Sequence, residues 1–587
     1  MAAQHAPFGR ARRAPLHALL LIFASADLAL SQAGLTHEAQ PASADAAPIN
    51  TPDVLAVLPA NVVAAVAARD LTELDKKLHW LAERLGVPVS PYTLAKGWLE
   101  IVDGVEDHAS AAIALIPGPA PQEDSGSLTL VLPCHDLPRL LSFLNPRPAG
   151  DGVFQVTLRG RESFVKMRNG YAFFAPAIST IARVISTKTS LAHRLDHHQR
   201  AGFAASDLSV WLDASSPDAH SRIPFYRNRV ADAAFASIRR SRPSGMIQLS
   251  ARVEESGLKF QIIPTGSGPP RSAAVPETDE SLLVGLPDEP FALAMGMSAG
   301  GSGAHIRALA AAIVNAASEY GILDDTKAAD LSQTLDLVLR NVRSLALSAS
   351  LLPEESEGRL GVAMALQTTS SYQTIRGEIE ALVRALQAGF FVDPGISRAA
   401  EQFRYRRDAE SISGVSVDHL EVDFSGFDPV YRARVQKILG SEGLRVRIAL
   451  IDGRHLAVSL GGGNARFEQI VSLIRGSRAP LANDAGTMLS ALGVSRTRSF
   501  EAYLSLDRTM RLVNSIRRAT DLGPALPAMP ETNAPIAAVM RSPGIAMSQL
   551  EVFVPIELIV SFKAALEAHA PAGDSQSRGP AATPESP

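Results

Sequence analysis

Residues 162–186 read ESFVKMRNGYAFFAPAISTIARVIS, and this stretch decides the fold class. Asn169-Gly170 separates two β-prone runs, Phe164–Met167 and Tyr171–Phe174. The pair Asn-Gly favours a type I′ turn, whose two central residues both need a positive φ, so these runs predict a β-hairpin. The next segment, Ala177–Ile185, places apolar residues at helical spacing. The stretch therefore predicts a strand, a turn, a second strand and a helix.

The same order of elements returns at Leu444–Arg475. Leu444–Ile448 is β-prone, Asp452-Gly453 supplies the turn, and His455–Val458 is a second β-prone run. A helix is predicted after it, because apolar residues recur with helical spacing at Phe467, Ile470, Val471 and Ile474. A unit that is used twice indicates an architecture, but it does not identify an activity.

Apolar and polar residues alternate in most of the other predicted strands, for example in Phe154–Leu158 and Ile247–Val253. Such alternation is typical of antiparallel sheets that are solvated on one face. We therefore predict an α+β fold with largely antiparallel sheets. Helices are expected to cover one face of these sheets, and related hairpin–helix units are expected to build two domains.

Two domains are expected because a single hydrophobic core stops growing near about 250–300 residues, whereas this chain has 587 residues. The Gly-, Pro- and Ser-rich stretch Gly266–Pro276 is typical of a linker. The predicted order is a signal peptide (1–31), a flexible spacer (32–52), α+β domain 1 (53–265), a linker (266–278), α+β domain 2 (279–570) and a disordered tail (571–587).

The N-terminus has the pattern of a secretory signal. Arg10, Arg12 and Arg13 precede the apolar run Leu16–Ala26, and small residues follow it. We therefore expect an exported protein, periplasmic, associated with the cell envelope or extracellular, with an uncleaved N-terminal anchor as the alternative. No transmembrane span is expected in the mature chain, because the apolar run is shorter than the roughly 20 residues that a spanning helix needs.

Composition narrows the classes of partner. The net charge is −4, and the basic residues are scattered without a basic block or interleaved aromatic residues. This pattern gives no support to nucleic-acid binding. Cys134 is the one cysteine, so an intrachain disulfide and a cysteine-based metal cage are both excluded. A buried packing role is expected for Cys134.

The segment Leu58-Pro59-Ala60-Asn61, followed by Ala68-Arg69-Asp70-Leu71, precedes a helix with leucines at helical spacing. Together with the hairpin units, this segment resembles uncharacterised exported bacterial proteins of a domain-of-unknown-function type. The resemblance spans residues 53–568 loosely. It implies an exported location and a repeated α+β architecture, and it implies no activity.

One stretch matches the G-x-S-x-G motif of serine hydrolases, Gly296-Met297-Ser298-Ala299-Gly300. In that motif a sharp strand-to-helix turn exposes the serine hydroxyl. A serine hydrolase would use Ser298 as the nucleophile, His455 as the base and Asp423 to orient it. The alternating strands around the motif count against this reading, because the hydrolase sheet is parallel and buried on both faces. A Gly-rich loop is the simpler explanation.

Histidines cluster at His193, His197 and His198. His193 and His197 are four residues apart, so on a helix they would share one face, and Asp207 would be a third candidate ligand for a metal ion. The general-base glutamate of helical zinc proteases is missing between them. A solvated loop or helix end is therefore the expected role, and no metal site is predicted.

The glycine run Gly461–Gly463 lacks the lysine of a P-loop and the spaced glycine of a dinucleotide fingerprint, so a strand-to-helix turn capped by Asn464 is expected and no cofactor is predicted. The overall expectation is an exported, non-enzymatic α+β protein that interacts with another protein or with the envelope. The alternatives are the serine hydrolase centred on Ser298 and a carrier of a small apolar ligand.

Overall fold

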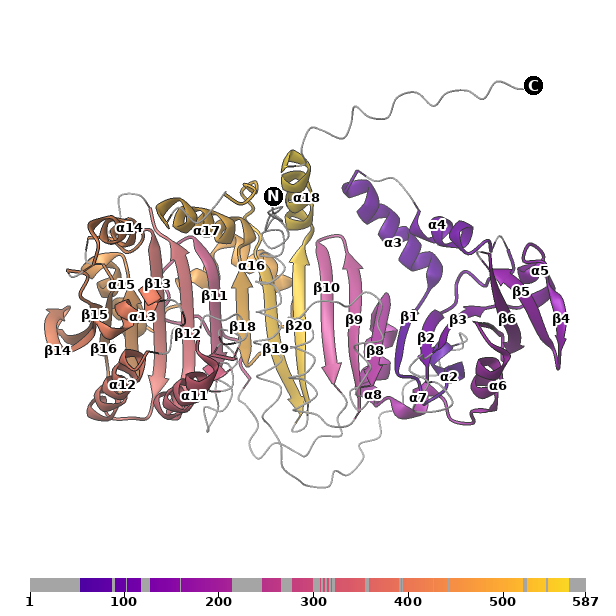
Figure 1. Cartoon of the computed structure of the whole chain (residues 1–587), viewed down its shortest axis with the longest axis horizontal. Coiled ribbons are helices and arrows are strands. Elements are labelled where there is room, and N and C mark those ends of the chain that lie inside the picture. The colour runs from indigo at the N-terminus through magenta and orange to yellow at the C-terminus, as the bar shows by residue number, and fades with distance from the viewer. Residues whose placement is uncertain are drawn as a thin grey trace, which may run out of the picture.

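The computed structural model describes the chain from Asp53 to His569, apart from residues 87–89, 118–126, 214–244, 265–276, most of 299–322, 354–357, 521–524, 545–546 and a few single positions. The predicted signal peptide, spacer and tail lie outside this part of the chain, as does most of the predicted linker. The described strands form one 20-stranded sheet that runs the length of the molecule, with helices packed along it (Figure 1).

Every strand pairing in the described part of the chain is antiparallel, and the strands follow one another across the sheet in a single row. The row is β4-β5-β6-β7-β3-β2-β1-β8-β9-β10-β20-β19-β18-β11-β12-β13-β17-β16-β15-β14. The α+β class and the antiparallel sheet predicted from the sequence are therefore present.

The strands of the first half of the chain are β1 (Ala64–Ala68), β2 (Ala111–Ile116), β3 (Ser127–Pro133), β4 (Arg147–Gly150), β5 (Val153–Leu158), β6 (Arg161–Arg168), β7 (Tyr171–Ala175), β8 (Leu208–Asp213), β9 (Met246–Glu254) and β10 (Gly257–Pro264). The strands of the second half are β11 (Phe291–Ser298), β12 (Val342–Leu351), β13 (Leu360–Thr368), β14 (Phe403–Ile412), β15 (Val415–Val422), β16 (Arg445–Leu450), β17 (His455–Leu460), β18 (Phe500–Leu504), β19 (Ile536–Gly544) and β20 (Met547–Pro555).

The helices of the first half are α2 (Val54–Val57), α3 (Leu71–Arg84), α4 (Pro91–Trp98), α5 (Leu137–Leu141), α6 (Ile178–Ser186), α7 (Leu191–Arg194) and α8 (His197–Ala205). Those of the second half are α11 (Asp325–Leu339), α12 (Tyr372–Gln387), α13 (Pro394–Glu401), α14 (Pro429–Leu439), α15 (Gly463–Arg475), the 3-10 helix η2 (Pro480–Asn483), α16 (Ala485–Leu492), α17 (Leu506–Thr520) and α18 (Ile556–His569).

The strand order has an internal correspondence. When the row is followed inward from either end, each strand of the first half occupies the same place as the strand numbered ten higher in the second half, from β4 and β14 at the two edges to β10 and β20 at the centre. The two halves meet where β10 pairs with β20, with Leu258 opposite Val554 and Ile262 opposite Leu550. In Figure 1 the indigo and magenta half lies on one side of this seam and the orange half on the other.

The segments just before β1 and β11 also share a sequence pattern. Leu55-x-x-Leu58-Pro59 precedes β1, and Leu283-x-x-Leu286-Pro287 precedes β11. All four leucines are at most 1% exposed, and each pair belongs to the main core of its own half. The predicted domain boundary falls between these two halves. It stays a prediction, because only Glu277 and Thr278 of residues 266–278 lie in the described part of the chain.

The two hairpin–helix units form as their sequences predict. Asn169 and Gly170 have φ of 51° and 77°, so both central turn residues have the positive φ that a type I′ turn needs. The hairpin β6–β7 leads into α6, and the hairpin β16–β17 leads into α15. The cap of α15 differs from its prediction. Gly462 is the N-cap, with φ of 74°, and Asn464 lies inside the helix, because three successive left-handed glycines make the turn two residues earlier.

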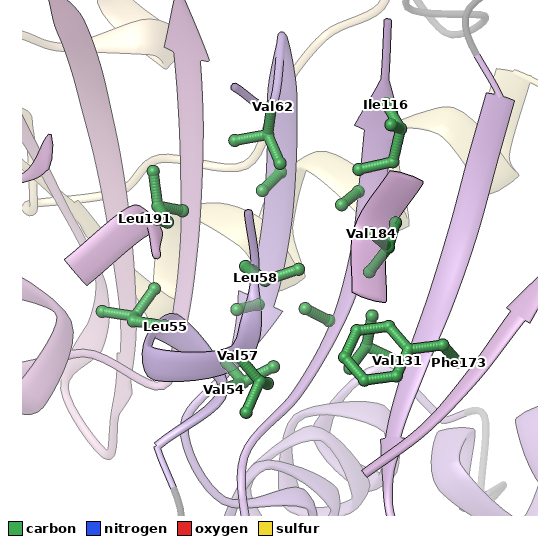
Figure 2. Packing of buried hydrophobic residues seen from close by; sticks show 14 of the residues in the cluster. Val54, Leu55, Val57, Leu58, Val62, Ile116, Val131, Phe173, Val184 and Leu191 are labelled. Atoms are coloured by element: carbon green, nitrogen blue, oxygen red, sulfur yellow. The ribbon is translucent and has the colours of Figure 1, made fainter. Parts of the chain in front are cut away.

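Cores lie on both faces of the sheet. In the first half, α2, α6, α7 and α8 pack on one face around a core that includes Leu55, Phe173 and Trp211. Figure 2 shows Leu55 and Phe173 in this core. In the second half, α15 packs on one face and α12 on the other. Strands such as β7 and β18 are therefore buried on both sides. The expectation that helices cover one face is not confirmed, because α15 and α12 pack on opposite faces of the second half.

Candidate anion-binding cleft

A hollow of about 680 Å³ opens between α14, α17 and the ends of β12 and β13. Four of its lining residues are cationic and none is acidic. The polar lining is Arg359, Lys437, Arg511, Asn514, Ser515 and Arg518, and the apolar lining is Leu351, Met510, Ala519, Ala528 and Met529. This excess of positive charge is local, because the whole chain has a net charge of −4.

Helix α17 supplies the largest share of the cleft. Arg511, Asn514, Ser515 and Arg518 stand at positions i, i+3, i+4 and i+7, so they share one face of the helix. Asn514 is 6% exposed and anchors the rim, since its side-chain amide donates to the Leu526 carbonyl at 3.0 Å and its oxygen accepts from the Leu526 N–H at 2.6 Å. This pair of bonds holds the segment that carries Ala528 and Met529 against the helix.

Helix α14 and the β12–β13 hairpin form the opposite wall. The backbone N–H of Arg359 donates to the carbonyl of Ile438 at 2.7 Å, which joins the start of β13 to the last turn of α14. Gly358 has φ of 89°, and a Cβ there would lie 2.4 Å from the Leu439 carbonyl carbon, so only glycine permits this close approach. Lys437, which precedes the contact by one residue, is thereby placed at the cleft.

The cations differ in how far they are neutralised. Arg511 donates to Asp507 at 2.7 Å and lies 3.1 Å from Glu531. Burial lowers the pKa of Arg511, but these two carboxylates outweigh it and leave the pKa raised. Within the described residues, no carboxylate pairs with Lys437 or with Arg518, and both side chains are exposed. Lys437 and Arg518 each lie in the last turn of a helix, where a basic residue also stabilises the helix dipole. That role does not require the two side chains to line the same hollow.

The structure does not bring together the three residues of the alternative serine triad. Ser298 ends β11, opposite Ser344, and the cross-strand row continues through Gln367 of β13 to His455 of β17. Ser298 and His455 are therefore three strand spacings apart, about 14 Å at roughly 4.8 Å per spacing. A nucleophile and its base must approach to hydrogen-bond distance. The turn after Ser298 lies outside the described residues.

His455 and Asp423 also have different partners. The Nδ1 atom of His455 lies 2.7 Å from Asp452, which is its carboxylate partner in this structure. Asp423 follows β15 and lies 3.3 Å from Arg404. The hydroxyl and the backbone N–H of Ser425 both donate to its side chain, and these hydrogen bonds lower the pKa of Asp423.

The predicted histidine pair does not share a helical face. Helix α7 ends at Arg194, and Asp196 caps the next helix, α8, so His193 and His197 lie on different helices. His193 Nδ1 contacts the Ser190 hydroxyl at 2.8 Å, and His197 stacks on His198. Asp207 is 4% exposed and accepts from Lys77 at 2.7 Å. No group of three or more metal-ligating side chains occurs in the part of the chain that the structure describes.

A buried polar network, which the sequence did not indicate, joins α12 to β14 and β15. Arg376 donates to both oxygens of Asp418, and the Tyr405 hydroxyl donates to Asp418 at 2.5 Å. Burial raises the pKa of Asp418, but the hydrogen bonds from Arg376 and Tyr405 outweigh burial and leave the pKa below its ordinary value. The carboxylate is therefore held ionised. Asp418 is fully buried and Arg376 is 7% exposed. These groups satisfy one another, which is the arrangement of a structural network.

The helical spacing of Arg511, Asn514, Ser515 and Arg518 is the one signal by which the sequence could have indicated the cleft. Arg359 and Lys437 come from distant segments that only the fold brings near. Comparison with known proteins gives no further guide, since no protein-family model, no curated protein and no solved structure matches this chain significantly. Within the described residues no helix is both long enough and apolar enough to cross a membrane.

Proposed function

We propose that this chain is an exported, non-enzymatic binding protein that takes an anionic ligand in the cleft between α14 and α17. The single observation that carries the proposal is the cleft lining, in which four cations gather without an acidic residue and two of them, Lys437 and Arg518, have no carboxylate partner among the described residues. Like charges held around one hollow repel one another, and an anion between them relieves that repulsion.

The apolar side of the cleft favours an amphiphilic anion. Leu351, Met510 and Met529 line the same hollow as the cations. Ligand sites commonly combine an apolar wall with a few convergent polar groups. This lining supports the second candidate function, a carrier of a small apolar ligand, in the form of a molecule with one anionic end. The serine hydrolase has no such support, because Ser298 and His455 are separated by two strands.

The test compares a double variant, Lys437→Gln with Arg518→Gln, with the wild-type chain. The probes are sodium tripolyphosphate and vesicles of phosphatidylcholine with and without phosphatidylglycerol, so that a free phosphate and a lipid headgroup are distinguished. The expected result is binding to at least one anionic probe, weakened at least tenfold in the variant and weakened by added salt in the wild type. Unchanged binding in the variant, or no binding to either anionic probe, would overturn the proposal.

A matched control changes the same net charge elsewhere. Arg200→Gln with Arg384→Gln removes two exposed cations, on α8 and α12, that do not line the cleft. This control should bind like the wild type. An equal loss of affinity in the control would mean that net charge, and not the cleft, attracts the anion.

The export proposal rests on the basic–apolar–small pattern of residues 1–31. Mass spectrometry of the protein from the envelope or medium of the native cell should find a new N-terminus at Asp27 or Gln32. A chain that begins at Met1 and remains in the cytosol would contradict export without touching the cleft.

A further inference from the structure

An apolar face is left open on the first half of the sheet. Val66, Ile113, Leu128 and Leu249 are 38%, 49%, 52% and 37% exposed. Ile113 pairs with Val66, and Leu249 joins the same row through Val210, so these side chains stand on one face of β1, β2, β8 and β9. Leu128 pairs with Leu115, two residues from Ile113, and so points to that face as well. These four residues define the open face.

The corresponding strands of the second half are covered on the same side. The cross-strand row that contains Leu249 continues through Ile262 and Leu550 to Met540 and Phe500, and then to Met297. On this side, α17 packs against β11 and β12, and Leu506 and Met510 are buried against Leu293, Leu504 and Ile536. No residue of β11, β12 or β18 is exposed. Their counterparts β1, β2 and β8 carry or border the open face.

Two segments cover this side of the second half. Helix α12 packs against Met297, Phe500 and Met540. The connection between β18 and β19, residues 505–535, covers Leu293, Leu504 and Leu550 through α17. The corresponding connection in the first half joins β8 to β9 through residues 214–245, and it is almost equally long. Asp213 pairs directly with Met246, so this connection leaves and re-enters the sheet at one end, beside the open face. Residues 214–244 lie outside the described part of the chain.

The sequence of this connection is suited to an apolar surface. It carries Ile223, Phe225, Val230, Phe235 and Ile238 among polar and basic residues. Both connections also contain the string Ser-Ile-Arg-Arg, at Ser237–Arg240 and at Ser515–Arg518 within α17. Large contiguous apolar surface is rarely left bare in a protein that does not use it for contact.

We propose that residues 214–244 of this same chain dock on the open face, in the place that α17 takes in the second half. We infer this segment as the occupant because both of its ends are anchored at the edge of the open face, at Asp213 and Met246. An intramolecular segment also has a high effective concentration at the site, which a second copy or another protein must exceed.

Cysteine cross-linking tests this contact. The natural Cys134 is 1% exposed and should not react in the folded chain. Three double variants pair Ile113→Cys with Val230→Cys, Phe235→Cys or Ile238→Cys, so that one helical register is not assumed. Mild oxidation should join the two introduced cysteines within one chain in at least one variant, as peptide mass mapping would show. Cross-links between chains would assign the face to a second copy, and the absence of any cross-link in all three variants would overturn the proposal.

A control pair and a second readout complete the design. Leu489, on α16 of the second half, is 61% exposed, and Leu489→Cys with Phe235→Cys should not form a cross-link. Independently, Phe235→Ser with Ile238→Ser should uncover the face and increase the binding of a hydrophobic dye severalfold over wild type, with no change in oligomeric state. Unchanged dye binding would contradict docking. Leu489→Ser, which removes an exposed leucine elsewhere, should not increase dye binding.

Discussion

The Nζ atom of Lys259 lies 3.2 Å from an Oε atom of Glu551, and this ion pair joins β10 of the first half to β20 of the second. Glu551 is 2% exposed. It also accepts hydrogen bonds from the N–H and hydroxyl of Ser495 and lies 3.3 Å from Arg541. A buried carboxylate with this many donors is satisfied, so the seam between the halves contains charge chemistry as well as strand pairing.

We predict that Glu551→Gln destabilises the chain. The amide removes the negative charge that Lys259 and Arg541 both face, which costs about 1–3 kcal/mol for a buried charged hydrogen-bond group. Urea denaturation would measure the free energy of unfolding. Glu557→Gln is the matched control, because Glu557 is exposed on α18. Equal stability of the two variants would show that the ion pair does not stabilise the seam.

The same group predicts a pH dependence. Burial raises the pKa of Glu551, but Lys259, Ser495 and Arg541 outweigh it, so the pKa in the folded chain is lower than the ordinary value for glutamate. Its contribution to stability is therefore complete above that ordinary value, near pH 4.3, and is lost as the pH falls through the lowered folded value. The wild type should lose more stability than Glu551→Gln in this acid range. Parallel curves for the two proteins would contradict the assignment.

Limited proteolysis tests the two-domain hypothesis. The Gly-, Pro- and Ser-rich sequence of residues 266–276 predicts early cleavage there, because unpaired backbone is the preferred substrate of proteases. The fragments should remain together in gel filtration, since β10 pairs with β20 across the seam. Denaturation should then release two fragments. Cleavage inside β1–β10 or β11–β20 before the linker would contradict the boundary.

The Arg376–Asp418 pair gives a third stability prediction. Asp418→Asn should destabilise the chain by about 1–3 kcal/mol, because the buried Arg376 guanidinium loses one of its two carboxylate partners and keeps only Asp408. Thermal and urea denaturation would measure the loss. Asp423→Asn, five residues later at a solvent-exposed pair with Arg404, should cost much less, because water screens that pair. A small effect at Asp418 would show that water or another group can compensate.

Local signals in the sequence predicted local structure well. Asn169-Gly170 predicted the β6–β7 turn, and Asp70 caps α3 by accepting from the Glu73 N–H at 2.9 Å. Such features depend on neighbouring residues, so they can be read from one segment. Leu55–Leu58 forms α2 and its C-cap because the Asp53 side chain caps the turn and the core of the first half buries Leu55.

Long-range relationships could not be predicted in this way. The pairing of β10 with β20 joins residues nearly 300 positions apart, and nothing in Leu258–Ile262 distinguishes this partner from other apolar strands. The cleft could not be predicted for the same reason, since Arg359 and Lys437 become neighbours only through the contact between β13 and α14. The buried pair of Arg376 and Asp418 could not be predicted either, because charged residues usually indicate a solvated face.

Ser298 should not act as a nucleophile. A serine hydroxyl is weak at neutral pH unless a hydrogen-bonded base activates it. His455 stands about 14 Å away by strand spacing, with Ser344 and Gln367 between them in the same row. The purified protein should therefore show no labelling by a fluorophosphonate probe and no ester hydrolysis that Ser298→Ala abolishes. Ser298→Ala should change the free energy of unfolding by less than about 0.5 kcal/mol, since the backbone N–H, not the side chain, donates to Ser499. Labelling that is lost in Ser298→Ala, or ester hydrolysis lost in His455→Ala, would mean that the strand carrying Ser298 rearranges and that the chain belongs to another class of protein.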